Sequence, residues 1–246
     1  MAQPQKQRSQ RPQRPPAPSP APNAKPQPGP KPAPNPAPKA AARATPPLLI
    51  LISAPSGGGK TTLCELLLKS QPQMTRAITC TTREPRPGER DGVDYHFFTA
   101  AEFLKRLQAG NFIENATVYG NSYGILKSEL LSKLREGRDV LLNVDVQGAA
   151  TIRAQAETEP ELRRALVTVF LTPPSLKVLE QRLKKRGADA EAVIQKRLAV
   201  AKQEISQWKN FDYLIISGSK EEDLRRMLAI VESEKMHSDR SLAPEL

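Results

Sequence analysis

The chain has 246 residues, and its 37 Lys and Arg outnumber its 26 Asp and Glu, which gives a formal net charge of +11. Its only two cysteines, Cys64 and Cys80, argue against a disulfide framework or a cysteine-based metal site. No apolar run approaches the length that crosses a membrane. We therefore expect a cytoplasmic protein with no membrane partner.

The N-terminal arm, residues 1–47, differs in composition from the rest of the chain. It holds 16 of the 24 prolines and eight Lys or Arg, but no Asp, Glu or aromatic residue. Such a segment buries too little apolar surface to offset its ordering entropy, so we expect a disordered arm. A basic arm can contact nucleic acid, but we favour a solubilising tail without a specific nucleic-acid partner.

The first motif of the folded part is a glycine-rich turn between a strand and a helix. The apolar run 48–52 precedes Ala54–Thr61, and an amphipathic segment follows it. Glycines let backbone N–H groups curl around a phosphate, and the helix N-terminus adds partial positive charge. We therefore predict that Lys60 reaches the β- and γ-phosphates of a nucleoside triphosphate and that Thr61 binds Mg²⁺. Ala54 stands where this motif usually has its first glycine.

The whole turn and the start of the helix are expected to contact the nucleotide. The residues predicted to bind the nucleoside triphosphate, which the family resemblance described below implies to be ATP, are Ala54, Pro55, Ser56, Gly57, Gly58, Gly59, Lys60, Thr61 and Thr62.

Further apolar runs alternate with helical patterns along the chain. Thr99 and Glu102 form a predicted capping box, and Phe103, Leu104 and Leu107 share one side of the helix that follows. We expect strands at 76–82, 95–98, 111–118, 140–145, 165–171 and 213–216, the last of them buried, and helices at 99–110, 126–135, 175–185, 189–209 and 220–235. Alternation of this kind predicts an α/β fold, with a parallel sheet covered on both faces. The stretch 79–125 interrupts the alternation and is predicted to be an inserted subdomain.

A second candidate site lies in this inserted stretch. Arg83 and Arg86 are three residues apart in a proline-rich segment, which makes an anion clamp. The hydroxyls of Tyr95 and Tyr123 can complete a phosphate cradle. Glu114 lies in an apolar strand, and its carboxylate suits guanine, whose N1–H and amino group are adjacent donors.

These motifs resemble those of the guanylate kinase family, from about Leu48 to Lys235. The matching segments are SAPSGGGKT at 53–61, TTREPRPGE at 81–89, FIE at 112–114, GNSYG at 120–124 and DVQG at 145–148. Two basic clusters, at 181–187 and 194–198, resemble the family's mobile lid. The resemblance implies a P-loop NTPase-type parallel sheet core at 48–78, 126–180 and 210–235, a GMP-binding insertion at 79–125 and a lid at about 181–209, followed by a tail at 236–246.

The resemblance also implies an activity and a role for each matching residue. ATP and GMP are the implied substrates, ADP and GDP the products, Mg²⁺ the cofactor with ATP, and dGMP a further candidate acceptor. Lys60, Arg182, Arg186 and Arg197 are implied to act on the transferring phosphoryl group. The residues implied to bind GMP are Thr79, Arg83, Arg86, Tyr95, Glu114, Tyr123 and Asp145.

Three departures from the family pattern bear on the substrates. Ile125 and Leu126 stand where a hydroxyl usually contacts the base, Asn143 replaces a frequent acid, and Ser217-Gly218 replace a commoner Asn-Asp pair near adenine. Alternatively, Asp145 is a helix N-cap without a role in binding, and the lid arginines are plain surface residues. Two alternatives stay open: a non-catalytic binding module, and a P-loop kinase for another phosphorylated small molecule. The sequence leaves the choice between a monomer and a homo-oligomer open.

Overall fold

The computed structural model describes residues 46–185 and 190–240 of the chain. The predicted arm lies outside the described residues except for Pro46 and Pro47, and residues 241–246 of the tail lie outside them as well. Arg186, one of the predicted lid arginines, is also outside. Among the residues that the structure describes, no helix combines the length and the apolar character that a membrane crossing requires.

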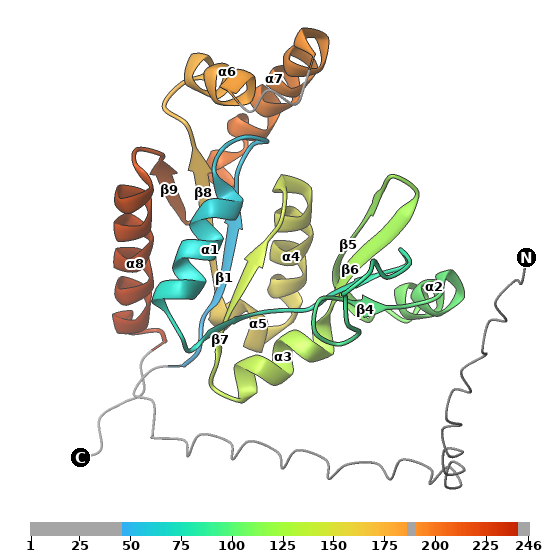
Figure 1. Cartoon of the computed structure of the whole chain (residues 1–246). Helices are drawn as coiled ribbons and strands as arrows, with labels where there is room; N and C mark the ends of the chain where they lie inside the picture. The colour runs from blue at the N-terminus through green and yellow to red at the C-terminus, as the bar shows by residue number, and fades with distance from the viewer. Residues whose placement is uncertain (1–45, 186–189, 241–246) are drawn as a thin grey trace, which may run out of the picture. The chain divides into compact units, whose positions relative to one another are not determined.

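A five-stranded parallel sheet forms the centre of the described fold (Figure 1). Its strands, in spatial order, are β2 (Met74–Arg76), β7 (Asp139–Asn143), β1 (Leu49–Ser53), β8 (Leu166–Thr172) and β9 (Tyr213–Ile216). Each neighbouring pair runs parallel. All five residues of the central strand β1 are buried. The predicted parallel α/β fold is confirmed.

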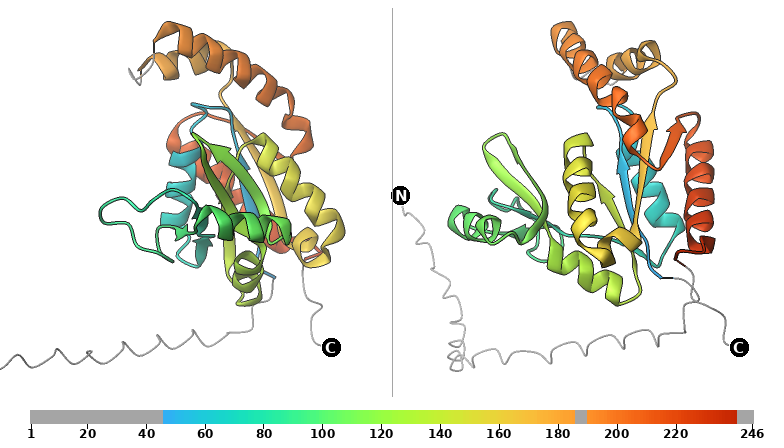
Figure 2. Two further views of the ribbon diagram at one scale, coloured as in Figure 1. Left: turned by 90° about the vertical axis from the view of Figure 1, so that its right-hand side faces the viewer. Right: turned by 180° about the vertical axis from the view of Figure 1, so that it is seen from behind.

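Helices cover both faces of this sheet. Alternate side chains of β1 point to opposite faces, as the period of two in a strand requires. Leu49 and Leu51 pack with helices α3 (Lys127–Arg135), α4 (Val146–Thr158) and α5 (Pro160–Ala165). Ile50 and Ile52 pack with α1 (Lys60–Ser70) and α8 (Lys220–Met236) on the other face. The two views in Figure 2 show these helices on the two sides of the sheet.

A second, four-stranded sheet lies in the predicted insertion. Its order is β4 (His96–Phe97), β3 (Thr79–Thr81), β6 (Asn121–Leu126) and β5 (Phe112–Val118). Helix α2 (Ala100–Gln108) packs on this sheet, and its predicted capping box of Thr99 and Glu102 is confirmed. The prediction of its apolar side is only partly right. Phe103 is buried and stacks on Phe112 with 4.4 Å between ring centroids, but Leu104 and Leu107 are exposed.

Three predicted elements differ from the structure, and strand β6 and helices α4 and α5 were not predicted. The predicted strand 76–82 is two strands, because the chain leaves the central sheet after β2 and enters the second sheet at β3. The glycine-flanked stretch before Leu126 forms strand β6, which was not predicted from the sequence. The strand 213–216 is not buried throughout, since β9 is an edge strand with Leu214 and Ile216 exposed. The predicted helix 189–209 ends early, at Ser206.

Two helices, α6 (Leu176–Lys185) and α7 (Glu191–Ser206), stand beside the glycine-rich turn (Figure 1). A small apolar cluster of Leu179, Leu183, Ile194 and Ala201 holds them together. A short 3₁₀ helix, Trp208–Asn210, follows α7 and leads into β9. A side chain at Gly57 would lie 2.9 Å from Leu183, so α6 packs closely against the glycine-rich turn.

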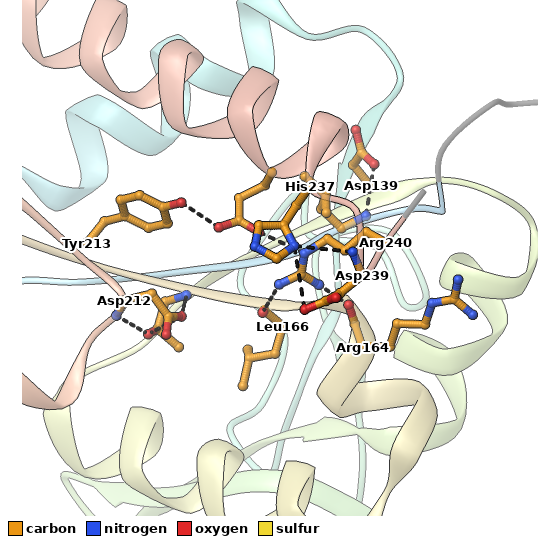
Figure 3. A network of polar contacts seen from close by, with 11 residues as sticks. Asp139, Arg164, Leu166, Asp212, Tyr213, His237, Asp239 and Arg240 are labelled. Atoms are coloured by element: carbon orange, nitrogen blue, oxygen red, sulfur yellow. Dashed lines mark hydrogen bonds and ion pairs between the residues drawn. The ribbon is translucent and has the colours of Figure 1, made fainter. Parts of the chain in front are cut away.

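A polar network lies where the strands of the central sheet begin (Figure 3). It connects the first and last described segments of the chain. The buried carboxylate of Asp139 accepts a hydrogen bond from the Leu48 backbone N–H at 3.0 Å and one from Lys235 Nζ at 2.6 Å. Glu234 accepts hydrogen bonds from the Tyr213 hydroxyl at 2.5 Å and from Arg240 Nε at 2.7 Å. The bond to Glu234 raises the pKa of Tyr213 to about 12.

Candidate active site

The glycine-rich turn after β1 encloses a cavity of about 320 Å³. Gly57 and Gly59 have φ values of 86° and 101°, a region that disfavours residues with a Cβ. Ala54 replaces the usual first glycine without obstruction, because its methyl group is buried in the apolar cluster behind the turn.

All nine residues predicted to bind ATP line this cavity. Its wall consists of Ala54, Pro55, Ser56, Gly57, Gly58, Gly59, Lys60, Thr61 and Thr62, together with Asp145 and Glu204. The Pro55 carbonyl closes the turn, because it accepts a hydrogen bond from the Gly58 N–H at 2.8 Å. The structure thus gathers the predicted residues around one cavity, and their contact with ATP stays a prediction.

Lys60 is held across this cavity from the end of β7. Its Nζ donates a hydrogen bond to the Val144 backbone carbonyl at 2.8 Å. Burial lowers the pKa of Lys60, while Asp145 and Glu204 are among the groups that raise it. A lysine in this surrounding presents a positive charge to an anion in the cavity.

Glu114 and Asp145 come together between the two sheets. A side chain on Gly148 would lie 3.1 Å from Glu114 Cγ, so Glu114 packs against the first turn of α4. Asp145 caps that helix and accepts hydrogen bonds from the N–H groups of Gln147 and Gly148 at 3.0 and 2.8 Å. Burial, and then the Asp145 charge, raise the pKa of Glu114 to about 7.

A β-bulge directs Glu114 toward α4. The pairing of β5 with β6 shifts between Phe112 and Glu114, so Ile113 is an extra residue in the strand. Phe112 packs in the cluster of the second sheet, whereas Ile113 packs in the main core. Gln155 of α4 donates hydrogen bonds from Nε2 to both of their carbonyls, at 3.2 and 2.9 Å. The bulge and this amide together join the second sheet to α4.

Three of the predicted anion-binding residues lie next to one another. The Arg83 guanidinium lies 5.3 Å from the centroid of the Tyr95 ring and interacts with Tyr123. It is also paired with Glu89, with Arg83 Nη2 at 2.8 and 2.9 Å from the two carboxylate oxygens. Hydrogen bonds from Arg83 and from the Arg86 backbone lower the pKa of Glu89. An anion of the protein therefore already occupies one side of the predicted clamp.

Two further predicted residues, Arg86 and Thr79, lie in this region. The Arg86 side chain is exposed, in a loop whose backbone N–H is bound by Glu89 at 2.8 Å. Thr79 is half-buried at the start of β3 and lines a wide hollow of about 720 Å³ beside β2 and the loop 89–95. The structure thus brings Arg83, Tyr95 and Tyr123 together, Thr79 lines a hollow that Tyr95 also lines, and the Arg86 side chain is exposed.

Of the predicted lid arginines, Arg182 makes the best-defined contacts. Its Nη1 donates to the Gly58 carbonyl at 3.4 Å and to the Ser217 hydroxyl at 3.1 Å. Ser217 in turn donates to Asp223 at 2.8 Å. Arg182, Ser217 and Asp223 line a cavity of about 300 Å³ next to the first turn of α1. Arg197 is half-buried on α7.

Two residues that contact this region were not predicted as site residues. Glu89 belongs to the segment TTREPRPGE of the inserted stretch, and an acid close to two arginines was the available signal. Glu204, on α7, lines the cavity of Lys60 although 144 positions separate the two residues. No local pattern in the sequence indicates such a contact, because it depends on how α7 packs.

Comparisons with known proteins by sequence and by structure point to the same family. The guanylate kinase family model matches residues 47–234. A guanylate kinase of Maricaulis maris is 42% identical over 189 residues, which cover 77% of this chain and 84% of that protein. One of Idiomarina loihiensis is 45% identical over 186 residues, which cover 75% and 83%.

Among solved structures, a guanylate kinase from Anaplasma phagocytophilum matches with a TM-score of 0.60 and 30% sequence identity, covering 81% of this chain and 92% of that one. Both kinds of comparison extend over nearly all of the described fold. The chain therefore belongs to the guanylate kinase family.

Proposed function

We propose that this protein transfers the γ-phosphoryl group of ATP to GMP and releases ADP and GDP. The observation that carries this proposal is the pairing of two sites at the carboxyl ends of the central strands. One is the glycine-rich cavity with Lys60, and the other is the acid pair of Glu114 and Asp145. Ligands of open α/β sheets bind at this edge. Membership of the guanylate kinase family supports the assignment of both substrates.

On the donor side, residues 54–62 would cradle the phosphates of ATP with their backbone N–H groups. Lys60 would exchange the Val144 carbonyl for a phosphate oxygen. Thr61 and Asp145 place a hydroxyl and a carboxylate in the cavity wall, and such oxygen donors fit Mg²⁺. The described residues hold no cluster of three or more His, Cys, Asp and Glu that fits a metal ion, so phosphate and water oxygens would supply most ligands. Bound Mg²⁺ would neutralise phosphate charge.

On the acceptor side, Arg83, Tyr95 and Tyr123 would bind the phosphate of GMP, with Arg86 joining from its exposed loop. Bidentate guanidinium contacts are strong and directional for phosphate. The ionised carboxylate of Glu114 would accept hydrogen bonds from N1–H and the amino group of guanine, and Asp145 and Thr79 would take the remaining polar contacts. Glu89 would hold Arg83 in position before GMP arrives.

The chain's own residues need to do little beyond positioning and charge neutralisation. A GMP phosphate oxygen is already an anionic nucleophile, so no general base is required. Residues 181–209 would act as a lid whose arginines, Arg182, Arg186 and Arg197, approach the transferring group. Closure would exclude water, which would otherwise hydrolyse ATP. In this proposal residues 79–125 form the GMP-binding insertion and the remainder of 48–235 the core.

The decisive measurement is ADP release from Mg²⁺-ATP with GMP, dGMP, AMP, CMP or UMP as acceptor. We expect ADP release with GMP and at least a hundredfold lower kcat for Lys60→Ala, because the variant lacks a charge aimed at the transferring phosphates; roughly this loss follows removal of one preorganised electrostatic group. Thermal melting of the variant checks that it is folded.

Other outcomes would point to other functions. A folded protein that binds GMP but releases no ADP with any acceptor would contradict the proposal and favour a binding module. A preference for an acceptor other than GMP would leave kinase activity intact and reject the assignment of guanine to Glu114.

A further inference from the structure

Glu204 brings a negative charge from helix α7 into a cavity that is built for phosphate. Its side chain lines the cavity enclosed by residues 54–62. It also lines a neighbouring cavity of about 360 Å³ between α4 and α7. It has no part in the phosphoryl transfer proposed for this site, and yet it is a carboxylate on an element of the proposed lid.

The contacts of Glu204 are those of a bound anion. The backbone N–H of Ser56, in the glycine-rich turn, is a hydrogen-bond donor to its carboxylate, and Lys60 attracts it electrostatically. Burial raises the pKa of Glu204, Ser56 and Lys60 lower it, and the nearby charge of Asp145 raises it. Its Oε2 atom is buried and has no hydrogen-bond partner among the described residues. One oxygen is thus bound by the turn, and the other is desolvated without compensation.

A phosphate group can take the place of the Glu204 carboxylate in the turn. A carboxylate and a phosphate are both acceptor-only anions that bind to N–H groups and to an ammonium group. A triphosphate in the same turn brings more charge and more acceptors than a single carboxylate. Because like charges at close range repel each other, Glu204 and a triphosphate cannot both keep these contacts. An unsatisfied buried oxygen also lowers the cost of moving Glu204 away.

We propose that Glu204 is a positioning residue that occupies the phosphate-binding turn when nucleotide is absent and holds helix α7 against it. Binding of a polyphosphate then displaces the carboxylate and releases this end of α7. This inference rests on the proposed function only in one respect, because it takes ATP as the natural ligand of the turn. The carboxylate weakens polyphosphate binding and links occupancy of the turn to the position of the proposed lid.

Glu204→Gln tests this proposal because glutamine keeps the size and the acceptor oxygen but removes the charge. We expect sodium tripolyphosphate and ATP to bind this variant about three- to tenfold more tightly than the unchanged protein, as measured by calorimetry without GMP. Binding of GMP, measured alone, is expected to be unchanged. Glu157→Gln is the matched control, since it removes an exposed carboxylate of α4.

A second measurement follows helix α7 itself. In the unchanged protein, tripolyphosphate is expected to speed amide hydrogen exchange in the C-terminal half of α7, and this response is expected to be smaller in Glu204→Gln. Unchanged or weaker tripolyphosphate binding by a folded Glu204→Gln variant would overturn the proposal. Slower exchange of α7 on binding would overturn it as well. Both readouts are binding measurements, so a failure to phosphorylate GMP would reject the proposed function without touching this inference.

Discussion

The surroundings of Glu114 change the chemistry of its carboxyl group. Burial and the neighbouring Asp145 raise its pKa to about 7, so near neutral pH a substantial fraction carries a proton. Only the ionised carboxylate can accept both hydrogen bonds that guanine offers. We therefore expect kcat/KM for GMP to rise with pH through this value. One pH unit below it, kcat/KM is expected to be about tenfold lower than on the plateau at high pH.

The control for this pH profile is Glu114→Gln. The phosphate of GMP also titrates, with a pKa of about 6, so part of the rise belongs to the substrate. The variant keeps the substrate's titration and loses that of Glu114, so its profile is expected to be flatter and lower. An equally steep rise in the variant would show that Glu114 does not control GMP recognition.

The same raised pKa has a consequence for stability. A carboxyl group with a higher pKa in the folded state favours folding when it is protonated, and it loses that contribution as the pH rises from its ordinary value of 4.5 to about 7. Glu114→Gln is therefore expected to melt at a higher temperature than the unchanged protein at pH 8, with a smaller difference at pH 5. Melting curves at the two pH values measure this change.

At the level of single residues, local motifs make part of the site predictable. The spacing of Lys60 and Thr61 after three glycines indicates a phosphate turn, because backbone curl and helix start are local properties. The grouping of Arg83 with Tyr95 and Tyr123 is predictable from residue types alone. Glu204 and the link from Arg182 through Ser217 to Asp223 are not, since each depends on the packing of helices far apart in the chain.

Among the elements, strand β5 and helix α4 fix the distance between the second sheet and the core. The bulge at Ile113 leaves two carbonyls that the Gln155 amide satisfies. Gln155→Leu removes both hydrogen bonds to these part-buried carbonyls, which together contribute about 1–3 kcal/mol. We expect the free energy of unfolding to fall by about that amount and KM for GMP to increase severalfold, because Glu114 follows the bulge directly.

Urea unfolding and steady-state kinetics measure these two effects of Gln155→Leu. Gln108→Leu, at the exposed end of α2, is the comparison that separates a lost contact from a general effect of the substitution. If Gln155→Leu lowers stability but leaves KM for GMP unchanged, the bulge supports the fold without positioning Glu114.

The elements that the sequence predicted correctly are those with a strong periodic or capping signal. Thr99 and Glu102 mark the start of α2, and the apolar run 48–52 marks β1. The division between β2 and β3 was missed because Ala77 and Ile78 continue the apolar, β-branched pattern while the chain passes from one sheet to another. Exposure of Leu214 and Ile216 was missed because their position on the last strand of the sheet is a property of topology.

Across the described fold, the residues of the candidate site and a stabilising polar network lie at opposite edges of the central sheet. One edge is where the strands end, and the other is where they begin. The cavities of the candidate site lie at the carboxyl ends of the strands, whereas the network of Asp139, Lys235 and Glu234 lies at their amino ends (Figure 3). Asp139 links the start of β1 with the end of α8, which are distant in sequence. A change at this edge is therefore expected to alter stability without altering the reaction.

Asp139→Asn tests this separation. The amide keeps one acceptor but loses the charge that pairs with Lys235, and its NH2 group places N–H donors against either the Lys235 ammonium or the Leu48 N–H. Breaking a buried ion pair from one side is strongly destabilising, so we expect the free energy of unfolding to fall by about 3–5 kcal/mol. The urea midpoint should fall while kcat and both KM values stay unchanged. Glu136→Gln, which removes an exposed ion pair with Arg138, is expected to leave the midpoint in place. A loss of activity in folded Asp139→Asn would show instead that the two edges of the sheet are coupled.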